Sequence, residues 1–151
     1  MLKKYNPRKI NGGWSPQGAT TASKTTIQFL GFMDGTFVEA EYAEDQVTTH
    51  VGAQGDVSVI LNANQLATVT VTFIQGSPTN TELSKYVPSA KRNVVPTGPF
   101  SLSDLNGKTV ISGANAFIRK TAKVEFAKNL TGRQWVFVIP EAEITVGEGG
   151  D

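Results

Sequence analysis

LATVTVTFIQGSPTNTELSKYV, the segment from Leu66 to Val87, contains the clearest structural pattern in this sequence. In its first part Val69, Val71 and Phe73 alternate with threonines. A period of two is typical of a strand with one apolar face and one polar face. We therefore predict a half-buried strand here and expect the rest of the core to pack against its apolar face.

A short helix is predicted directly after this strand. Ser77 supplies an N-cap, and Pro78 supplies a first helical residue whose ring already fixes φ. The apolar residues Leu83, Tyr86 and Val87 then follow at spacings i, i+3 and i+4, which places them on one helical face. The proline that follows restricts the residue before it, so the helix is expected to extend from about Pro78 to Val87.

The composition favours one β-rich domain, and the N-terminal MLKKYNPRKINGG lacks the apolar region of a secretory signal, so we expect synthesis in the cytoplasm. The 151 residues suit a single domain, and 17 Thr with 15 Val favour antiparallel β structure. The charged fraction is 18% and the net charge is +1, so charge does not indicate a nucleic acid or an anionic membrane as partner. Cysteine is absent, which excludes disulfides and thiolate metal sites. No apolar run approaches the roughly 18 residues that would suggest a membrane-spanning helix.

Turn signals divide the chain into short strands, as in a sandwich or barrel. Asp34-Gly35 predicts a hairpin between the strands Thr25–Met33 and Phe37–Tyr42. The other predicted strands are Val47–Val51, Val57–Leu61, Phe100–Leu105, Thr109–Ser112, Ala116–Arg119, Lys123–Ala127, Gln134–Ile139 and Ala142–Val146. Alternation within these segments predicts that Phe73, Trp135 and Phe137 are mostly buried.

The polar, Gly-rich segment Met1–Lys24 is predicted to be an N-terminal arm. Two interpretations stay open: a frayed terminus, or a segment in which Tyr5 and Trp14 dock on a neighbouring subunit. The expected organisation is an arm over 1–24, a β domain over 25–146 and a flexible acidic tail over 147–151. If the arm contacts neighbouring subunits, deletion of Met1–Ala22 is expected to leave a folded domain whose copies no longer stack on one another.

The segment Ser89–Pro99 is predicted to be an irregular surface loop, long enough to suggest binding. Its Lys91 and Arg92 are candidates for contacts between subunits.

A search for catalytic or metal-binding patterns finds none that is specific. His50 has no acidic neighbour at a spacing that indicates a general base. The acidic residues between 39 and 45 could bind a hard cation, but their spacing suits a solvated face better. Gly52 and Gly55 lack the lysine and the following helix of a phosphate-binding loop. We expect no enzyme activity and no cofactor.

Three stretches carry a resemblance to a known family: GFMDGTFVEAEYAEDQVTTHVGAQGDVS, ATVTVTFIQGSPTNTELS and DLNGKTVISGANAFIRKTAKVEFAKNLTGRQWVF. In order and content they resemble the tail tube proteins of contractile-tailed phages, over roughly Thr25 to Val146. The resemblance implies a small antiparallel β-sandwich or half-open barrel with one short α-helix. It also implies rings of six subunits whose inner strands join into a continuous barrel.

The resemblance further implies the partners and location. Stacked rings would form the inner tube of a virion tail, assembled in the host cytoplasm, in contact with a tail sheath protein and with baseplate and tail terminator proteins. Double-stranded DNA would pass through without specific binding, and no membrane is involved. The alternatives are another ring-forming virion component, such as a tail terminator or baseplate ring, and a stand-alone carbohydrate-binding β-sandwich.

Glu39 and Glu41 are the candidate channel-lining residues. They lie on one side of the strand Phe37–Tyr42, and the opposite side is apolar enough to contact the core. Carboxylates around a channel would keep DNA phosphates from the wall. The alternative is that they solvate the outer surface or pair with Lys123 or Arg119.

Overall fold

The computed structural model describes residues 6–16, 26–105 and 108–147. In chain order its elements are η1 (Pro7–Lys9), β1 (Ile10–Trp14), β2 (Ile27–Gln28), β3 (Val38–Tyr42), β4 (Val47–Val51), β5 (Val57–Leu61), β6 (Ala67–Ile74), α1 (Pro78–Ser84), β7 (Gly98–Asp104), β8 (Val110–Ile118), β9 (Gly132–Ile139) and β10 (Glu143–Thr145). This confirms the predicted mainly β class with antiparallel pairing and a short α-helix.

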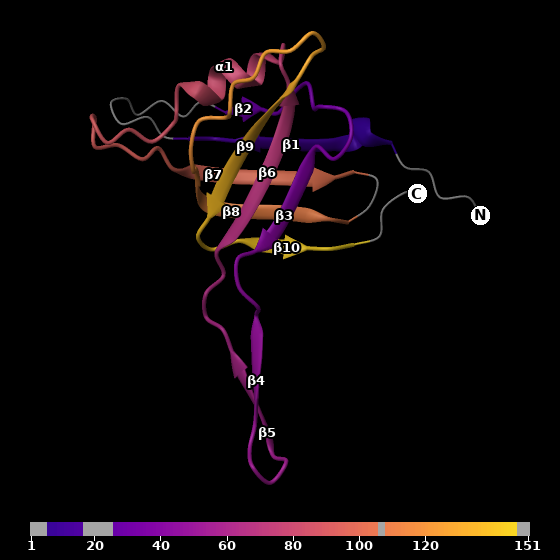
Figure 1. Ribbon diagram of the computed structural model, residues 1–151, viewed down its shortest axis with the longest axis vertical. Helices are drawn as coiled ribbons and strands as arrows, with labels where there is room; N and C mark the ends of the chain where they lie inside the picture. The colour runs from indigo at the N-terminus through magenta and orange to yellow at the C-terminus, as the bar shows by residue number, and fades with distance from the viewer. Residues whose placement is uncertain (1–5, 17–25, 106–107, 148–151) are drawn as a thin grey trace, which may run out of the picture.

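Eight strands form the body, in the order β2-β1-β7-β8-β9-β6-β3, with β10 also paired to β8. The strands β3, β6 and β9 cross steeply over β1, β7, β8 and β10 (Figure 1). Strand β8 belongs to both layers, since it pairs with β7 along most of its length and with β9 at Phe117 and Ile118. The result is a half-open barrel or sandwich whose core lies between the crossing layers.

Strand β6 lies at the centre of its layer, as its alternating sequence predicts. It pairs with β9 over its whole length and with β3 from Ala67 to Val71. Val69, Val71 and Phe73 are fully buried, whereas the threonines between them are half-buried on the other face. The half-buried strand is confirmed.

An aromatic cluster fills the core. The ring of Phe137 lies 5.3 Å from Trp14, 5.2 Å from Phe100 and 5.6 Å from Phe29, measured between centroids. Phe73 packs on Phe29 at 5.5 Å. The predicted burial of Phe73, Trp135 and Phe137 is confirmed.

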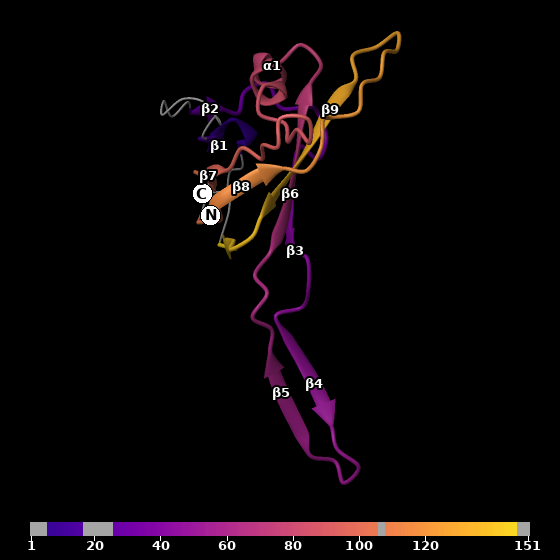
Figure 2. The ribbon, with the colours of Figure 1, turned by 90° about the vertical axis from the view of Figure 1, so that its left-hand side faces the viewer.

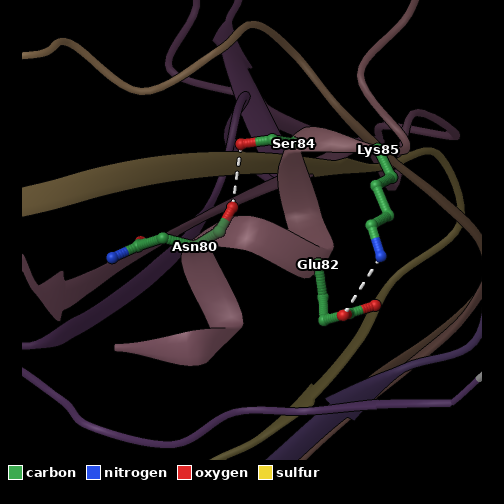
Figure 3. Close-up of polar contacts among 4 residues, drawn as sticks. All are labelled: Asn80, Glu82, Ser84 and Lys85. Atoms are coloured by element: carbon green, nitrogen blue, oxygen red, sulfur yellow. Dashed lines mark hydrogen bonds and ion pairs between the residues drawn. The ribbon is translucent and has the colours of Figure 1, made fainter. Parts of the chain in front are cut away.

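Helix α1 is shorter than predicted. Ser77 caps it by accepting a hydrogen bond from the amide of Thr79, with Pro78 in the first turn, as expected. It ends at Ser84 instead of Val87, because the amides of Lys85 and Tyr86 donate to carbonyls only three residues back. Figure 3 shows the polar contacts along its exposed side: Ser84 Oγ donates to the carbonyl of Asn80 (2.8 Å), and Lys85 pairs with Glu82 (3.4 Å).

The predicted hairpin around Asp34-Gly35 is wrong. Strand β2 covers only Ile27–Gln28 and pairs with β1, whereas β3 pairs with β6. The chain changes partner at Gly31, whose φ of +74° is in the left-handed region that favours glycine. After this turn Phe32 bridges to Phe73, so the segment leads onto β6 and does not continue β2.

Other predicted elements also differ from the structure. Lys123–Ala127 is not a strand but part of a largely exposed loop between β8 and β9. Ile10–Trp14, expected in an arm, is strand β1 and pairs with β7 from Ile10 to Trp14. The arm is therefore wrong for these residues, because Trp14 supplies enough apolar surface to hold the segment in the core. Removal of Met1–Ala22 would remove β1, so we now expect that this deletion disturbs folding.

No helix within the described part of the chain is long and apolar enough to cross a membrane.

Candidate assembly interface

Side chains with catalytic potential do not converge in the described part of the chain. His50 lies exposed on β4, opposite Ser58 of β5. Residues 6–16, 26–105 and 108–147 contain no group of three or more His, Asp or Glu placed to hold a metal ion. Gly55 donates its amide to the carbonyl of Gly52, so these glycines close the tip of a hairpin.

Glu39 and Glu41 lie exposed on β3, on the side predicted for them. Val38, Ala40 and Tyr42 on the other side pack against the core. Opposite partners in an antiparallel pair share a face, so both carboxylates lie beside the threonines of β6 that pair with them, at Thr70 and Thr68. Together these residues line a shallow hollow of about 300 Å³.

Neither carboxylate has the basic partner considered as an alternative. In the described residues no ion pair joins Glu39 or Glu41 to Lys123 or Arg119. Both carboxylates are exposed to solvent.

Strand β3 has an open edge. Among the described strands it pairs with β6 alone, so its other side presents unpaired backbone groups. Such an edge is a template for pairing with another chain unless it is covered. The sheet can therefore be extended by a strand from a second molecule at β3.

The hairpin of β4 and β5 projects away from the body of the protein (Figures 1 and 2). It continues the β3–β6 pair beyond the core, since the amide of Ala43 donates to the carbonyl of Leu66 (2.9 Å) and that of Asn62 to Gln46 (2.9 Å). All ten residues of the two strands are exposed. We call this segment, residues 43–66, the projecting hairpin.

One face of the projecting hairpin is apolar. The register pairs Val47 with Leu61, Thr49 with Val59 and Val51 with Val57, which places all six on one face. Leu61 is 79% exposed, and the valines are 45–62% exposed. A two-stranded hairpin alone is marginally stable in water, so this face is suited to being covered by a partner.

A polar anchor fixes the base of the projecting hairpin. Asn62 Nδ2 donates to Glu44 Oε2 at 2.8 Å and to the carbonyl of Asp45 at 3.1 Å. Hydrogen bonds from Asn62 and then Asn64 lower the pKa of Glu44 below its ordinary value. The anchor holds the junction between hairpin and body, although Glu44 itself is exposed.

The loop between β8 and β9, residues 119–131, lies at the end of the molecule opposite the projecting hairpin (Figure 2). We call it the basic loop, because it contains Arg119, Lys120, Lys123 and Lys128. It is also a second exposed apolar surface. Phe126 is 78% exposed, although the guanidinium of Arg133 lies 5.5 Å from its ring centroid. Thr131 Oγ1 donates to the carbonyl of Glu125 (2.8 Å), which ties the middle of the loop to its C-terminal end.

The remaining candidate contacts are distributed as follows. Lys91 and Arg92 lie exposed in a compact turn closed by a bridge between Ser89 and Val94. Trp14 does not dock elsewhere: its side chain is 0% exposed, and its Nε1 donates to the carbonyl of Ala116 at 3.1 Å. The burial of Trp14 within its own chain argues against its expected role as a contact between subunits. Tyr5 lies outside the described residues.

The alternation of residues predicted β4 and β5 but not their position outside the body. One signal was available, because residues 43–66 contain no aromatic residue and no lysine or arginine. A segment without large aromatic anchors is poorly suited to a core that aromatic rings dominate.

Comparison with known proteins gives one sequence likeness. The chain is 26% identical over 132 residues to structural protein ORF10 of Pseudomonas phage KPP10, covering 86% of this chain and 75% of that protein. No protein-family model matches the sequence.

The fold is similar to that of the tube-terminating cap of the anti-feeding prophage. The TM-score is 0.54 at 9% identity, and the match covers 96% of this chain and 93% of the cap. In sequence, then, the chain is similar to a phage structural protein, and in fold it is similar to a protein that caps a tube.

Proposed function

We propose that this protein is a virion structural subunit that assembles with copies of itself into rings of a contractile-tail tube, six subunits to a ring. The observation that carries the proposal is the projecting hairpin, which exposes an apolar face that a free monomer would be expected to bury. The likeness to a phage structural protein over 86% of the chain supports a place in a virion.

Within such a ring, the open edge of β3 pairs with a strand of the next subunit, and repetition closes the sheet into a barrel. Glu39 and Glu41 then face the channel, where they keep the phosphates of passing DNA from the wall. Lys91 and Arg92 contact a neighbouring subunit. The sheath, baseplate and terminator proteins of the tail are the further partners.

A second candidate function is the terminal ring of the tube. The fold likeness to a tube-terminating cap favours it. The two functions differ in one property: a tube subunit stacks on itself without limit, whereas a terminator presents one face that does not stack.

Negative-stain electron microscopy of the purified full chain tests both. Tubes support the tube subunit, and single rings that do not lengthen with protein concentration support the terminator. A monomer in light scattering at high concentration, with neither rings nor tubes on the grid, contradicts both.

A further inference from the structure

The projecting hairpin carries charge of one sign. Residues 43–66 contain the acidic residues Glu44, Asp45 and Asp56 and no lysine or arginine, which gives a net charge of −3 with His50 neutral. These carboxylates accompany the exposed apolar face of Val47, Val51, Val57, Val59 and Leu61. A surface that covers this face should therefore be apolar with a basic surround.

The basic loop fits that description. Residues 119–131 contain four basic residues, Arg119, Lys120, Lys123 and Lys128, against one acidic residue, Glu125, which gives a net charge of +3. The same loop exposes the apolar side chains of Val124, Phe126 and Leu130. It thus complements the projecting hairpin in charge and in apolar character.

The two surfaces cannot meet within one chain, because they lie at opposite ends of the molecule in both views (Figures 1 and 2). A contact between different patches of two identical chains is heterologous. It repeats head to tail, and produces a closed ring or an open stack.

We infer that the apolar face of the projecting hairpin docks on the basic loop of a second copy of this chain. Val59, near the centre of the hairpin face, lies against Phe126 of the neighbouring copy, with Asp45 and Asp56 close to its lysines. This inference rests on the proposed self-assembly and names the two surfaces that carry it.

Charge argues against the symmetrical alternative, in which two projecting hairpins pack face to face. That arrangement would bring together two surfaces of net charge −3, and juxtaposed like charges oppose association. The head-to-tail contact instead joins opposite charges, which also directs the encounter of the two chains.

Disulfide trapping tests the contact directly, because the natural chain contains no cysteine. Val59→Cys and Phe126→Cys chains, one with a mass tag, are mixed and oxidised. The expected main product is the mixed dimer, with little dimer in either variant alone. A matched control pairs Val59→Cys with Ser84→Cys, an exposed position on α1, and should give only background. Val59–Val59 dimers as the main product, or mixed dimer no more abundant than in the control, overturn the inference.

Charge reversal gives an independent readout. Asp45→Lys with Asp56→Lys, or Lys123→Glu with Lys128→Glu, should each weaken self-association by roughly tenfold or more in sedimentation velocity. All four substitutions in one chain should restore association, because both surfaces are reversed together. The matched controls, Glu141→Lys with Glu143→Lys and Lys85→Glu with Lys108→Glu, should leave it within about twofold. Circular dichroism confirms that each variant is folded.

The outcomes separate this inference from the proposed function. If the natural chain does not associate at all, the proposed assembly fails. If it forms rings or tubes but the four substitutions fail to restore what each pair removes, assembly stands and the paired surfaces are wrong.

Discussion

At the scale of single residues, both tryptophans lie in the core, although the sequence predicted this for Trp135 and placed Trp14 in an arm. Trp14 and Trp135 are both buried, and each indole nitrogen has a partner: Trp14 Nε1 donates to the carbonyl of Ala116, and Trp135 Nε1 donates to Asn80 Oδ1 at 2.9 Å. A buried indole combines large apolar area with one satisfied polar atom. Both residues are therefore expected to stabilise the monomer.

Trp14→Ala and Trp135→Ala should each lower the free energy of unfolding by about 3–5 kcal/mol, because each leaves a cavity in the core. Urea denaturation of the monomer measures this free energy of unfolding. Phe126→Ala, at an exposed aromatic, is the control and should change stability by less than about 1 kcal/mol. Normal monomer stability with impaired assembly in Trp14→Ala would reinstate Trp14 as a contact between subunits.

The hydrogen bond from Asn62 is the main cause that lowers the pKa of Glu44. Asn62→Ala removes the first of the hydrogen bonds that lower the pKa of this carboxyl, so the pKa should rise toward its ordinary value. Because the folded-state pKa is lowered, the anchor stabilises the hairpin base above the unfolded pKa and is lost as pH falls through the folded one. NMR titration of the side-chain carboxyl measures the shift. The neighbouring exposed Gln65→Ala should leave it unchanged, and an unaltered pKa in Asn62→Ala contradicts the assignment.

At the scale of elements, the projecting hairpin is separable from the body. Since Ala43 and Leu66 are already hydrogen-bonded, residues 44–65 can be replaced by Asn-Gly, a two-residue turn that suits the twist of paired strands. The shortened chain should keep a melting temperature close to that of the full chain, because every fully buried apolar residue lies outside the excised segment. It should also lose self-association.

Calorimetry and light scattering measure the two properties of the shortened chain. Rings or tubes formed without the hairpin would contradict its role in assembly. A large fall in melting temperature would show that the hairpin belongs to the folding unit.

Strand β1 is expected to behave in the opposite way. Removal of residues 1–5 keeps the whole of β1, which pairs with β7 from Ile10 to Trp14, and is expected to leave a folded protein. Removal of residues 1–22 deletes this pairing and the side chain of Trp14, so the near-ultraviolet circular dichroism of the core should be lost or the protein should aggregate. A soluble, natively packed 23–151 fragment would contradict the placement of β1 in the core.

At the scale of the whole molecule, the exposed pair Glu39 and Glu41 tests the orientation of subunits in a tube. If these residues face the channel, Glu39→Lys with Glu41→Lys should still allow tubes but should make them retain duplex DNA. The retention should weaken with added salt, because exposed charges are screened within about 8 Å at physiological ionic strength.

Co-sedimentation of labelled DNA with assembled tubes across a salt series measures the retention. In virions that carry the variant, the rate of genome delivery is a second measurement. Glu141→Lys with Glu143→Lys makes the same change in charge at other exposed positions and serves as the control. Equal retention by the two variants, or none by either, would indicate that Glu39 and Glu41 lie outside the channel.

The sequence by itself determined the local structure wherever one segment carried a complete pattern. The alternation from Thr68 to Phe73 and from Gln134 to Ile139 predicted two strands and the burial of Phe73, Trp135 and Phe137, because side-chain direction in a strand depends only on residue parity. Ser77 and Pro78 predicted the helix start, since an N-cap acts within three residues. The same dependence on residue parity predicted that Glu39 and Glu41 share one face of β3.

Only the tertiary structure decided which segments pair and which lie in the body. The chain turns at Gly31, so β2 pairs with β1 and β3 pairs with β6 instead of the two forming a hairpin. A sequence pattern can predict a strand, but it does not predict which strand pairs with it. Val47–Val51 has the alternation of a half-buried strand yet is exposed throughout, whereas the glycine-rich Ile10–Trp14 pairs within the body and buries Trp14. Burial is a property of the whole packed chain: a valine is covered only where another element reaches it, and one tryptophan can hold a weak strand in place.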